Sequence, residues 1–445
     1  MTAPVAVACA AALLAAAAPV AAQGAPLRLT FGAAVARAAT EAPAVSVARL
    51  RGDAADARAR QASASLWPGL SAAASYTNRS FNRASLGLGA LPGAPADPLV
   101  GPFDIMDGRL SLQQPLLDFG ARRRRDAARA AAGAARAGTE RTAEAAAANA
   151  ALAYLESARA DALVAARLAD SVLAAELVAL ARTQREAEVA IGLDVTRAET
   201  QLVAAIGGLI VARNARARAH LALARALGLE ADQRIELADT LRADLATVGL
   251  PSDRDTLVAL ARLGRPDLTA QLADAAAARA SVDAVTAERL PRLDLAADLG
   301  LNGPAVADMI VTRQVAVQVT LPIIDDLRRG PRLAERRAQA AEAEVLARDL
   351  ASQVAAEIDG ARYDLEAAAA GLTIAAQGVR LATAELAQAR ERFAAGVAGN
   401  LELITAQVSL LRARDAEIDA RYQAATARVA LARAVGVAHT LGSPR

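Results

Sequence analysis

The chain has 445 residues, of which 54% are hydrophobic but only 2% aromatic, and its formal net charge is +2. Compact cores of this size usually bury many Phe, Tyr and Trp side chains, whereas small apolar residues with Leu, Glu and Arg suit long, closely packed helices. All 50 basic residues are Arg, which excludes a P-loop lysine and a Schiff-base lysine. The nearly balanced charge gives no bulk attraction for nucleic acid, so we expect no nucleic-acid partner.

Residues 1–22 are predicted to be a signal peptide. No charged side chain precedes Arg28, and the small residues at 20–22 suit a cleavage site that leaves Gln23 as the mature start. The only cysteine, Cys9, lies in this segment, in a poor lipidation motif. We therefore expect a cysteine-free mature chain without a lipid anchor. A retained Ala-rich membrane anchor is the alternative.

The rest of the sequence consists of two similar halves. The octapeptides 222–229 and 430–437 agree at six of eight positions, with an offset of 208 residues. Such recurrence at a fixed offset is typical of an internal duplication. The expected organisation is a first repeat at 28–230, a linker at 231–253 and a second repeat at 254–440.

Each repeat is predicted to contain a helix, a β-hairpin and then long helices. No proline occurs from Leu116 to Leu250 or from Arg332 to Ser443, and few residues there are β-branched. Such stretches favour helix. A continuous helix over 120–191 would be roughly 108 Å long at 1.5 Å per residue, far longer than a globular domain is wide.

The two hairpins are expected at about 69–117 and about 292–323. Apolar residues recur there at every second position, which predicts strands with one apolar face. About ten residues per strand is the length that crosses a bilayer when tilted. The expected lipid-facing residues are Leu110, Leu112, Leu295, Leu299, Val315, Val317 and Val319.

Aromatic residues flank the first hairpin and predict an interface girdle. These are Trp67 and Phe119 at its base and Phe81 and Phe103 at its top. Four strands cannot close on themselves in lipid, so several chains would have to share one barrel around a wet lumen. A soluble amphipathic sheet lying on its own helices is the alternative.

Three segments resemble the TolC-like outer-membrane efflux proteins of Gram-negative bacteria: LWPGLSAAASYT at 66–77, LSLQQPLLDFGARRR at 110–124 and VQVTLPIIDDLRRG at 317–330. The resemblance covers nearly the whole mature chain. It implies a mostly α fold with β, in which a duplicated unit contributes long helices to a coiled-coil α-barrel. It also implies four transmembrane strands per chain in a trimeric, 12-stranded β-barrel. Asp325-Asp326-Leu327 departs from the glycine-containing turn usual in the family.

The two helix reversals are the sharpest candidates for a site. By resemblance they are periplasmic tips, where a periplasmic adaptor docks and carboxylates narrow the aperture. Helix capping is the alternative role, because Gly and Asn suit helix ends and acids suit helix starts. The expected gate residues are Asp194, Arg197, Glu402 and Thr405, and the expected adaptor-docking residues are Gly192, Arg392, Gly396, Gly399 and Asn400.

The sequence predicts no enzyme, because no nucleophile-elbow, zinc-protease, P-loop or dinucleotide-binding motif occurs in it. Carboxylates on the helices alternate with Arg at three- and four-residue spacing, which predicts surface ion pairs. His220 and His439 have no Cys or His partner at ligand spacing, so we expect neither a metal nor a cofactor.

The expected function is a passive exit duct in the outer membrane, with a long periplasmic extension. It would release drugs or metal ions delivered by an inner-membrane pump and a periplasmic adaptor, as the resemblance implies. One alternative is the same duct in a type I protein secretion system. Another, of a different class, is a periplasmic coiled-coil scaffold without a pore.

Overall fold

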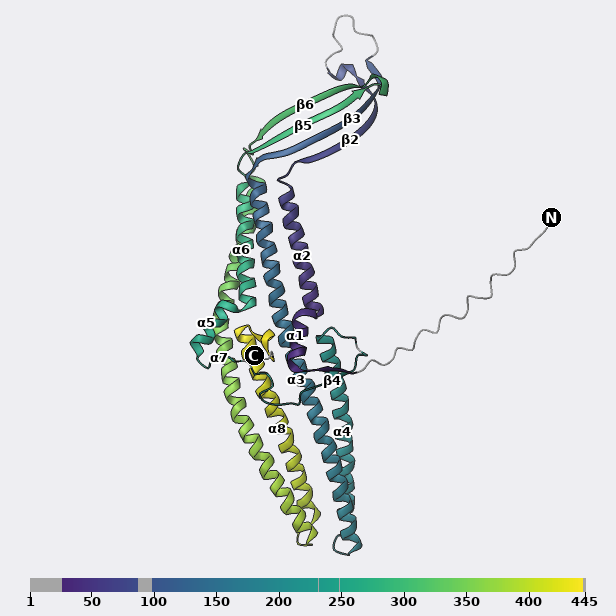
Figure 1. The fold of residues 1–445 in the computed structure, drawn as a ribbon, viewed down its shortest axis with the longest axis vertical. Helices are drawn as coiled ribbons and strands as arrows, with labels where there is room; N and C mark the ends of the chain where they lie inside the picture. Colours follow the sequence, from purple (N-terminus) through teal and green to yellow (C-terminus); the bar gives the residue numbers. More distant parts are fainter. Residues whose placement is uncertain (1–25, 87–97, 231, 248, 443–445) are drawn as a thin grey trace, which may run out of the picture. The chain divides into compact units, whose positions relative to one another are not determined.

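The computed structural model describes residues 26–86, 98–230, 232–247 and 249–442. The expected signal peptide, including Cys9, lies outside the described residues. The expectation of a mostly helical chain with a few strands is confirmed (Figure 1). In chain order the elements are β1 (Leu27–Leu29), α1 (Phe31–Glu41), α2 (Pro43–Ala64), β2 (Gly69–Asn82), β3 (Leu99–Asp118), α3 (Phe119–Glu186), α4 (Gly192–Ala226), β4 (Ile235–Leu237), α5 (Arg254–Gly264), α6 (Pro266–Ala287), β5 (Arg292–Gly303), β6 (Ile310–Thr320), α7 (Asp326–Ala394) and α8 (Asn400–Val435).

The element order runs twice through the chain. A helix, two strands, a very long helix and a shorter helix follow one another from α2 to α4 and again from α6 to α8. The long helices α3 and α7 have 68 and 69 residues. The absence of proline from α3, and from α7 beyond Pro331, allows an uninterrupted hydrogen-bond ladder.

The chain divides into two compact units, each built from parts of both halves. The sheet unit comprises Val47–Arg141 and Arg265–Gln353. The tip unit comprises the chain up to Ser46, Thr142–Gly264 and the chain from Val354 onward. Each unit is described separately below.

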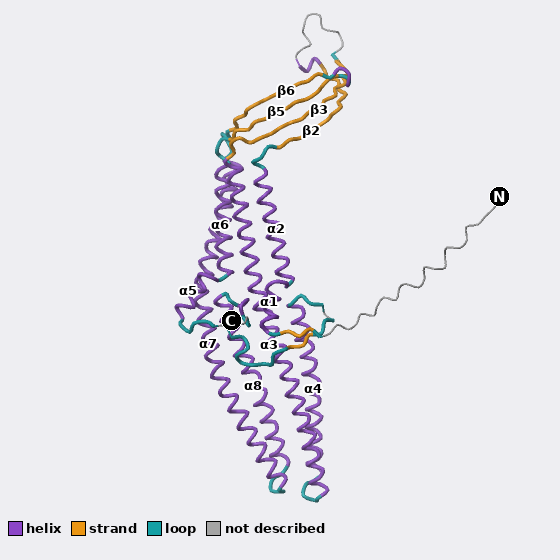
Figure 2. The backbone as a smooth tube through the Cα atoms, in the orientation of Figure 1, coloured by secondary structure: helices purple, strands orange, loops and turns teal. Residues whose placement is uncertain are grey.

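The sheet unit contains one four-stranded antiparallel sheet in the order β2-β3-β5-β6 (Figure 2). Leu112 lies opposite Ala297, which in turn lies opposite Val315. Because the side-chain period of a strand is two, this register carries one face across all four strands. We call it the apolar face: Leu70, Ala72, Ala74, Tyr76 and Asn78 of β2; Asp104, Met106, Gly108, Leu110, Leu112 and Gln114 of β3; Leu293, Leu295, Ala297, Leu299, Leu301 and Gly303 of β5; Val311, Arg313, Val315, Val317 and Val319 of β6.

The opposite side of the sheet, the polar face, carries Ser, Thr, Gln and charged residues. Arg109 donates to Asp298 at 2.5 Å and to Asp107 at 2.9 Å on this face. The two faces therefore differ sharply in chemistry, and the sheet ends at two unpaired edge strands, β2 and β6, among the described residues.

The tip unit contains two helical hairpins, made by the later part of α3 with α4 and by the later part of α7 with α8. Away from the reversals, a core forms around Phe31 and Tyr154, whose rings pack edge to face at 5.6 Å. The parallel pair of β1 and β4 covers this core. The expected linker therefore includes a strand that pairs with the start of the first repeat.

Among the described residues one helix, α4, is long and apolar enough to cross a membrane by length and composition. In the tip unit Val195 and Ala198 near its start and Leu223 near its end are buried in the helical cores. Val203, Ile210 and Val211 of the same helix are exposed, so packing among the described residues buries only part of its apolar surface.

Candidate functional site

The first helix reversal joins α3 to α4. α3 ends at Glu186, and α4 begins at Gly192 after an extended Ile191. The main-chain N–H of Ile191 donates to Oδ2 of Asp194 at 3.3 Å, and the N–H of Asp194 donates to the carbonyl of Ile191 at 3.0 Å. The carboxylate of Asp194 is buried and satisfies the start of its own helix.

The second reversal joins α7 to α8 and depends on a left-handed glycine. Gly396 has φ +69°, which L side chains seldom adopt. Its N–H donates to the carbonyl of Phe393 at 3.0 Å, and the N–H of Val397 donates to that of Arg392 at 3.0 Å. Gly399, which precedes α8, has an ordinary φ of −79°. Only Gly396 of these two glycines is required by its backbone conformation.

The two reversals contact each other within one chain. The side-chain amide of Asn400, only 2% exposed, donates to the main-chain carbonyl of Asp194 at 2.6 Å. Gln184 Nε2 donates to the carbonyl of Ala394 at 3.3 Å. Apolar side chains from all four helices form a core next to these contacts: Leu177, Val178, Ala181, Val195, Ala198, Ala382, Leu386, Ala389, Phe393, Leu403, Ala406 and Leu410.

The expected gate residues form local polar contacts. Arg392 Nε lies 3.3 Å from Oε1 of Glu402, and both side chains are about half exposed. Arg197 lies 4.0 Å from the carboxylate of Asp194. The hydroxyl of Thr405 donates to the carbonyl one turn earlier, at Leu401. Each exposed ion pair is worth only about 0–1 kcal/mol, so these contacts are easily exchanged for others.

Large apolar side chains are exposed around both reversals, a feature that the glycine and charge pattern did not predict. They are Val189, Ile191, Leu193, Val397 and Leu401. We call this set the apolar rim. Exposed apolar groups gathered at one place often mark an interaction surface. The signal in the sequence was the presence of β-branched and Leu residues in turns, where polar residues are usual.

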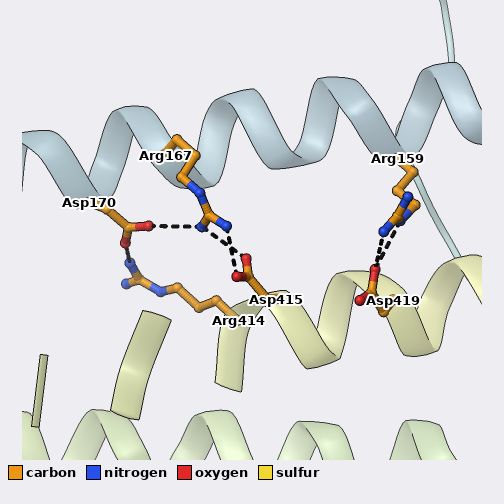
Figure 3. Close-up of polar contacts among 6 residues, drawn as sticks. All are labelled: Arg159, Arg167, Asp170, Arg414, Asp415 and Asp419. Carbon is orange, nitrogen blue, oxygen red and sulfur yellow. Dashed lines mark hydrogen bonds and ion pairs between the residues drawn. The ribbon is translucent and has the colours of Figure 1, made fainter. Parts of the chain in front are cut away.

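Sequence reasoning also missed a buried ion-pair cluster between α3 and α8, which Figure 3 shows. Asp170 is 4% exposed and accepts hydrogen bonds from Arg414 at 3.1 Å and from Arg167 at 3.4 Å. Arg167 also donates to both oxygens of Asp415, at 2.9 and 2.7 Å. Arg167 and Asp170 are paired at the expected three-residue spacing on one helix, but Asp170 is buried and its second partner, Arg414, comes from α8.

The charges in this cluster shift one another. Burial raises the pKa of the Asp170 carboxyl, in spite of the two guanidinium groups beside it. The hydrogen bond to Asp415 raises the pKa of Arg167, which stays charged. Earlier on α3, Arg159 donates to Asp419 of α8 at 2.9 Å, so polar contacts between α3 and α8 continue beyond this cluster (Figure 3).

The seven residues expected to face lipid all lie on the apolar face of the sheet. The exposed members are Leu110, Leu299, Val315, Val317 and Val319, and Leu112 and Leu295 are partly buried. No other described element of the sheet unit buries these exposed side chains.

The four expected girdle aromatics are placed differently from one another. Trp67 is exposed, and the guanidinium of Arg122 lies 6.0 Å from the ring centre of Phe119. The rings of Phe81 and Phe103 lie 6.0 Å apart. Strand alternation places Phe103 on the same side as Arg109, which is the polar face.

Across the described parts of the chain, no three His, Cys, Asp or Glu side chains are grouped so that they could hold a metal ion. His220 contacts Asp161 at 3.2 Å, and His439 contacts Glu144 at 2.7 Å. Each histidine thus has one carboxylate partner.

The sequence of this chain is similar to those of known proteins. The family model described as "Outer membrane efflux protein" matches residues 34–229 and 257–437. Protein CyaE of Bordetella pertussis is 29% identical over 290 residues, which cover 64% of this chain and 60% of that protein. The alignment thus spans less than two thirds of that relative.

Solved structures share the fold. The CmeC outer membrane channel of Campylobacter jejuni superposes with a TM-score of 0.79 at 17% identity, over 93% of this chain and 87% of that one. The outer membrane protein VceC of Vibrio cholerae superposes with a TM-score of 0.77 at 23% identity, over 91% and 96%. At such identities the likeness establishes the architecture alone.

Proposed function

Because this chain belongs to the outer membrane efflux protein family, we propose that it forms the outer-membrane exit duct of a tripartite efflux system. Its place is the outer membrane, with helices extending into the periplasm. Proteins of this family and fold are channels. The finer assignments below are argued from the sheet and the helix reversals.

The observation that carries the proposal is the exposed apolar face of a sheet with two open edges. Lipid can cover an apolar face, but it cannot satisfy the main-chain groups of an open strand edge. Since each neighbouring pair in β2-β3-β5-β6 is antiparallel, β2 and β6 run in opposite directions. β6 of one copy can therefore continue the antiparallel ladder with β2 of the next.

We propose that three copies close a barrel of twelve strands in this way. The apolar face would lie against lipid, and the polar face, with Arg109, Asp294 and Asp298, would line a water-filled lumen. The expected lipid-facing residues keep that role in this proposal. Two consecutive repeats in each chain, at 28–230 and 254–440, are supported by the repeated element order and by the two stretches that the family model matches.

The helix reversals are the proposed periplasmic tips. Exposed apolar side chains of the apolar rim would bind a periplasmic adaptor, with Gly192, Gly396, Gly399 and Asn400 shaping the turns beneath them. Arg392 with Glu402, and Asp194 with Arg197, would hold the aperture narrow until the adaptor binds. This chain would act passively, and the energy would come from the inner-membrane pump.

The proposed cargo is small molecules, either drugs or metal ions. A duct for protein secretion would use the same barrel and the same tips, so the pump and adaptor decide between the two. Co-purification of tagged protein from its native membranes, followed by mass spectrometry of the bound pump, tests this choice. A resistance-type pump supports the proposal, and a peptide-exporting ATPase contradicts it.

The duct itself is tested by planar-bilayer conductance of the purified, detergent-extracted oligomer. Discrete, long-lived current steps are the expected result, because a wet lumen lined by the polar face conducts ions. Silent protein that is soluble without detergent would overturn the barrel and favour a periplasmic scaffold.

A further inference from the structure

Arg313 lies on the wrong face of its strand for a charged residue. It projects from edge strand β6 opposite Leu299, which lies opposite Leu110, so all three share the apolar face. The side chain is exposed and has no ion pair or hydrogen bond to any described residue. An unpaired guanidinium on a lipid-facing surface costs from about 0–1 kcal/mol near the interfaces to about 2–4 kcal/mol at the midplane, and an anionic partner would reduce that cost.

The only other charged residue on this face is Asp104, beside the opposite edge strand. Tyr76 Oη and Asn78 Nδ2, both of β2, donate to its Oδ1 at 2.7 Å each. Its second oxygen, Oδ2, accepts no hydrogen bond from the described residues. The apolar face thus carries the unpaired guanidinium of Arg313 at its β6 edge. Near its β2 edge it carries the carboxylate of Asp104, one oxygen of which accepts no hydrogen bond from the described residues.

The strands are staggered across the sheet, which determines where two copies would meet. Ser75, near the middle of β2, lies on the rung of Asp107 and Asn302, and that rung ends at Ile310, the first residue of β6. The middle of β6, Val315, lies five positions further along. Strands in a closed, tilted barrel are staggered in this manner.

The middles of β5 and β6 share one rung, since Ala297 lies opposite Val315, and we place the middle of the next copy's β2 on that rung in the same way. Apolar faces must also coincide, which allows only shifts of two residues. Both conditions are met when Val315 lies opposite Tyr76 of the next copy. In antiparallel pairing Arg313 then lies opposite Asn78, and Asp104 is one strand beyond. Two strand spacings are about 10 Å, which extended Arg and Asp side chains can bridge.

We propose that Arg313 pairs with the free carboxylate oxygen of the next copy's Asp104, over Asn78, and so fixes the register in which neighbouring subunits join. A slip of two residues would keep every apolar side chain on the lipid side, so hydrophobic burial alone does not select the register. The ion pair between Arg313 and Asp104 selects the register, because a subunit slipped by two residues leaves both of these charges unpaired. This inference rests on the proposed barrel.

Cysteine cross-linking tests the register directly. The sequence has no cysteine after Cys9, so engineered pairs stand alone in the mature chain. The variant V317C with A74C places both thiols on the predicted rung and leaves Asp104, Asn78 and Tyr76 intact. The variant V319C with A74C is the matched control for a two-residue slip. Oxidised trimers are expected to give covalent bands with the first pair and at least several-fold less with the second.

The contribution of Arg313 is then measured in both double-cysteine variants, V317C with A74C and V319C with A74C. Arg313→Leu is expected to shift cross-linking toward the slipped pair by several-fold, and the exchange R313D with D104R to restore the original ratio. The inference is overturned if trimers of the two double-cysteine variants cross-link equally. It is also overturned if Arg313→Leu leaves the ratio of cross-linking between the two variants unchanged. Either outcome leaves the proposed barrel intact. A chain that stays monomeric in detergent, before any substitution, overturns the proposed function as well.

Discussion

Asp170 Oδ1 on α3 lies 3.1 Å from Arg414 Nη1 on α8, in a contact that is almost closed to solvent on the carboxylate side. The same carboxylate meets Arg167 of its own helix through its other oxygen. One buried anion thus holds a guanidinium from each of two helices that belong to different halves of the chain. Helices α3 and α8 are joined by charge as well as by packing.

Replacing Asp170 by Ala should destabilise the tip unit by about 1–3 kcal/mol. The substitution leaves Arg167 and Arg414 without a shared partner, and breaking a fully buried pair costs about 3–5 kcal/mol, which their partial exposure reduces. Thermal unfolding of the purified oligomer measures the loss. Glu199→Ala, which removes an exposed pair with Arg182 at 2.6 Å, is the control and should shift the melting temperature little.

Stability should also depend on pH through Asp170. Burial raises the pKa of this carboxyl above its ordinary 3.8, so the folded chain binds the proton more tightly than the unfolded chain. The stability that this group contributes is then greatest below pH 4 and declines as pH rises through the raised pKa. The difference in melting temperature between the natural chain and Asp170→Asn should therefore decrease from pH 4 toward pH 7. A difference in melting temperature that does not change with pH would contradict the predicted direction of the pH dependence.

Gly396→Ala should destabilise the second helix reversal. Its φ of +69° disfavours any L side chain, and an added Cβ would lie 2.9 Å from Val189 Cγ1 of the first reversal. A left-handed non-glycine residue costs roughly 1–2 kcal/mol before that clash is counted. Gly399→Ala is the matched control, since φ is −79° and its Cβ would meet open space. Limited proteolysis at the reversal should increase only for Gly396→Ala; equal cleavage of the two variants would contradict the requirement for glycine.

Glu402→Ala should raise single-channel conductance with little change in melting temperature. The pair with Arg392 is half exposed, so its loss costs about 0–1 kcal/mol, whereas a carboxylate at the aperture would affect every passing ion. Glu199→Ala again serves as a control, because it breaks a comparable exposed pair between α3 and α4. Equal conductance in both variants would assign Glu402 to helix capping alone.

Val317→Asp should block insertion into the membrane, and Ala316→Asp should not. The two neighbours lie on opposite faces of β6, so in the proposed barrel the same charge would be placed against lipid in one case and in the lumen in the other. An Asp on the lipid face of a barrel costs less than an Arg or Lys at the midplane, which costs about 2–4 kcal/mol, but the cost is repeated in each subunit. The heat-modifiable oligomer in outer-membrane fractions is the measurement. Normal assembly of Val317→Asp would refute the lipid-facing assignment.

The hairpins and long helices were predictable because their signals are local. Alternation around Leu295 and Val317 predicts the strands, the lack of proline predicts the long helices, and the Gly- and Asn-containing reversals predict where α3 and α7 end. Partners across helices have no such signal. Asp170 and Arg414 are 244 positions apart, and nothing near either residue indicates the other. Phe103 was expected in an interface girdle from its aromatic character, and its face of the strand follows only from the register.

A consequence for synthesis follows from the core around Phe31. Leu441 is buried in that core, and Glu144 accepts hydrogen bonds from the main chain of Ala438 and of His439. Residues made first and residues made hundreds of positions later thus complete the same structure. In the proposed outer-membrane duct, a nascent chain that has crossed the inner membrane only in part would have no finished core, and its helices would be exposed until residue 441 has been delivered.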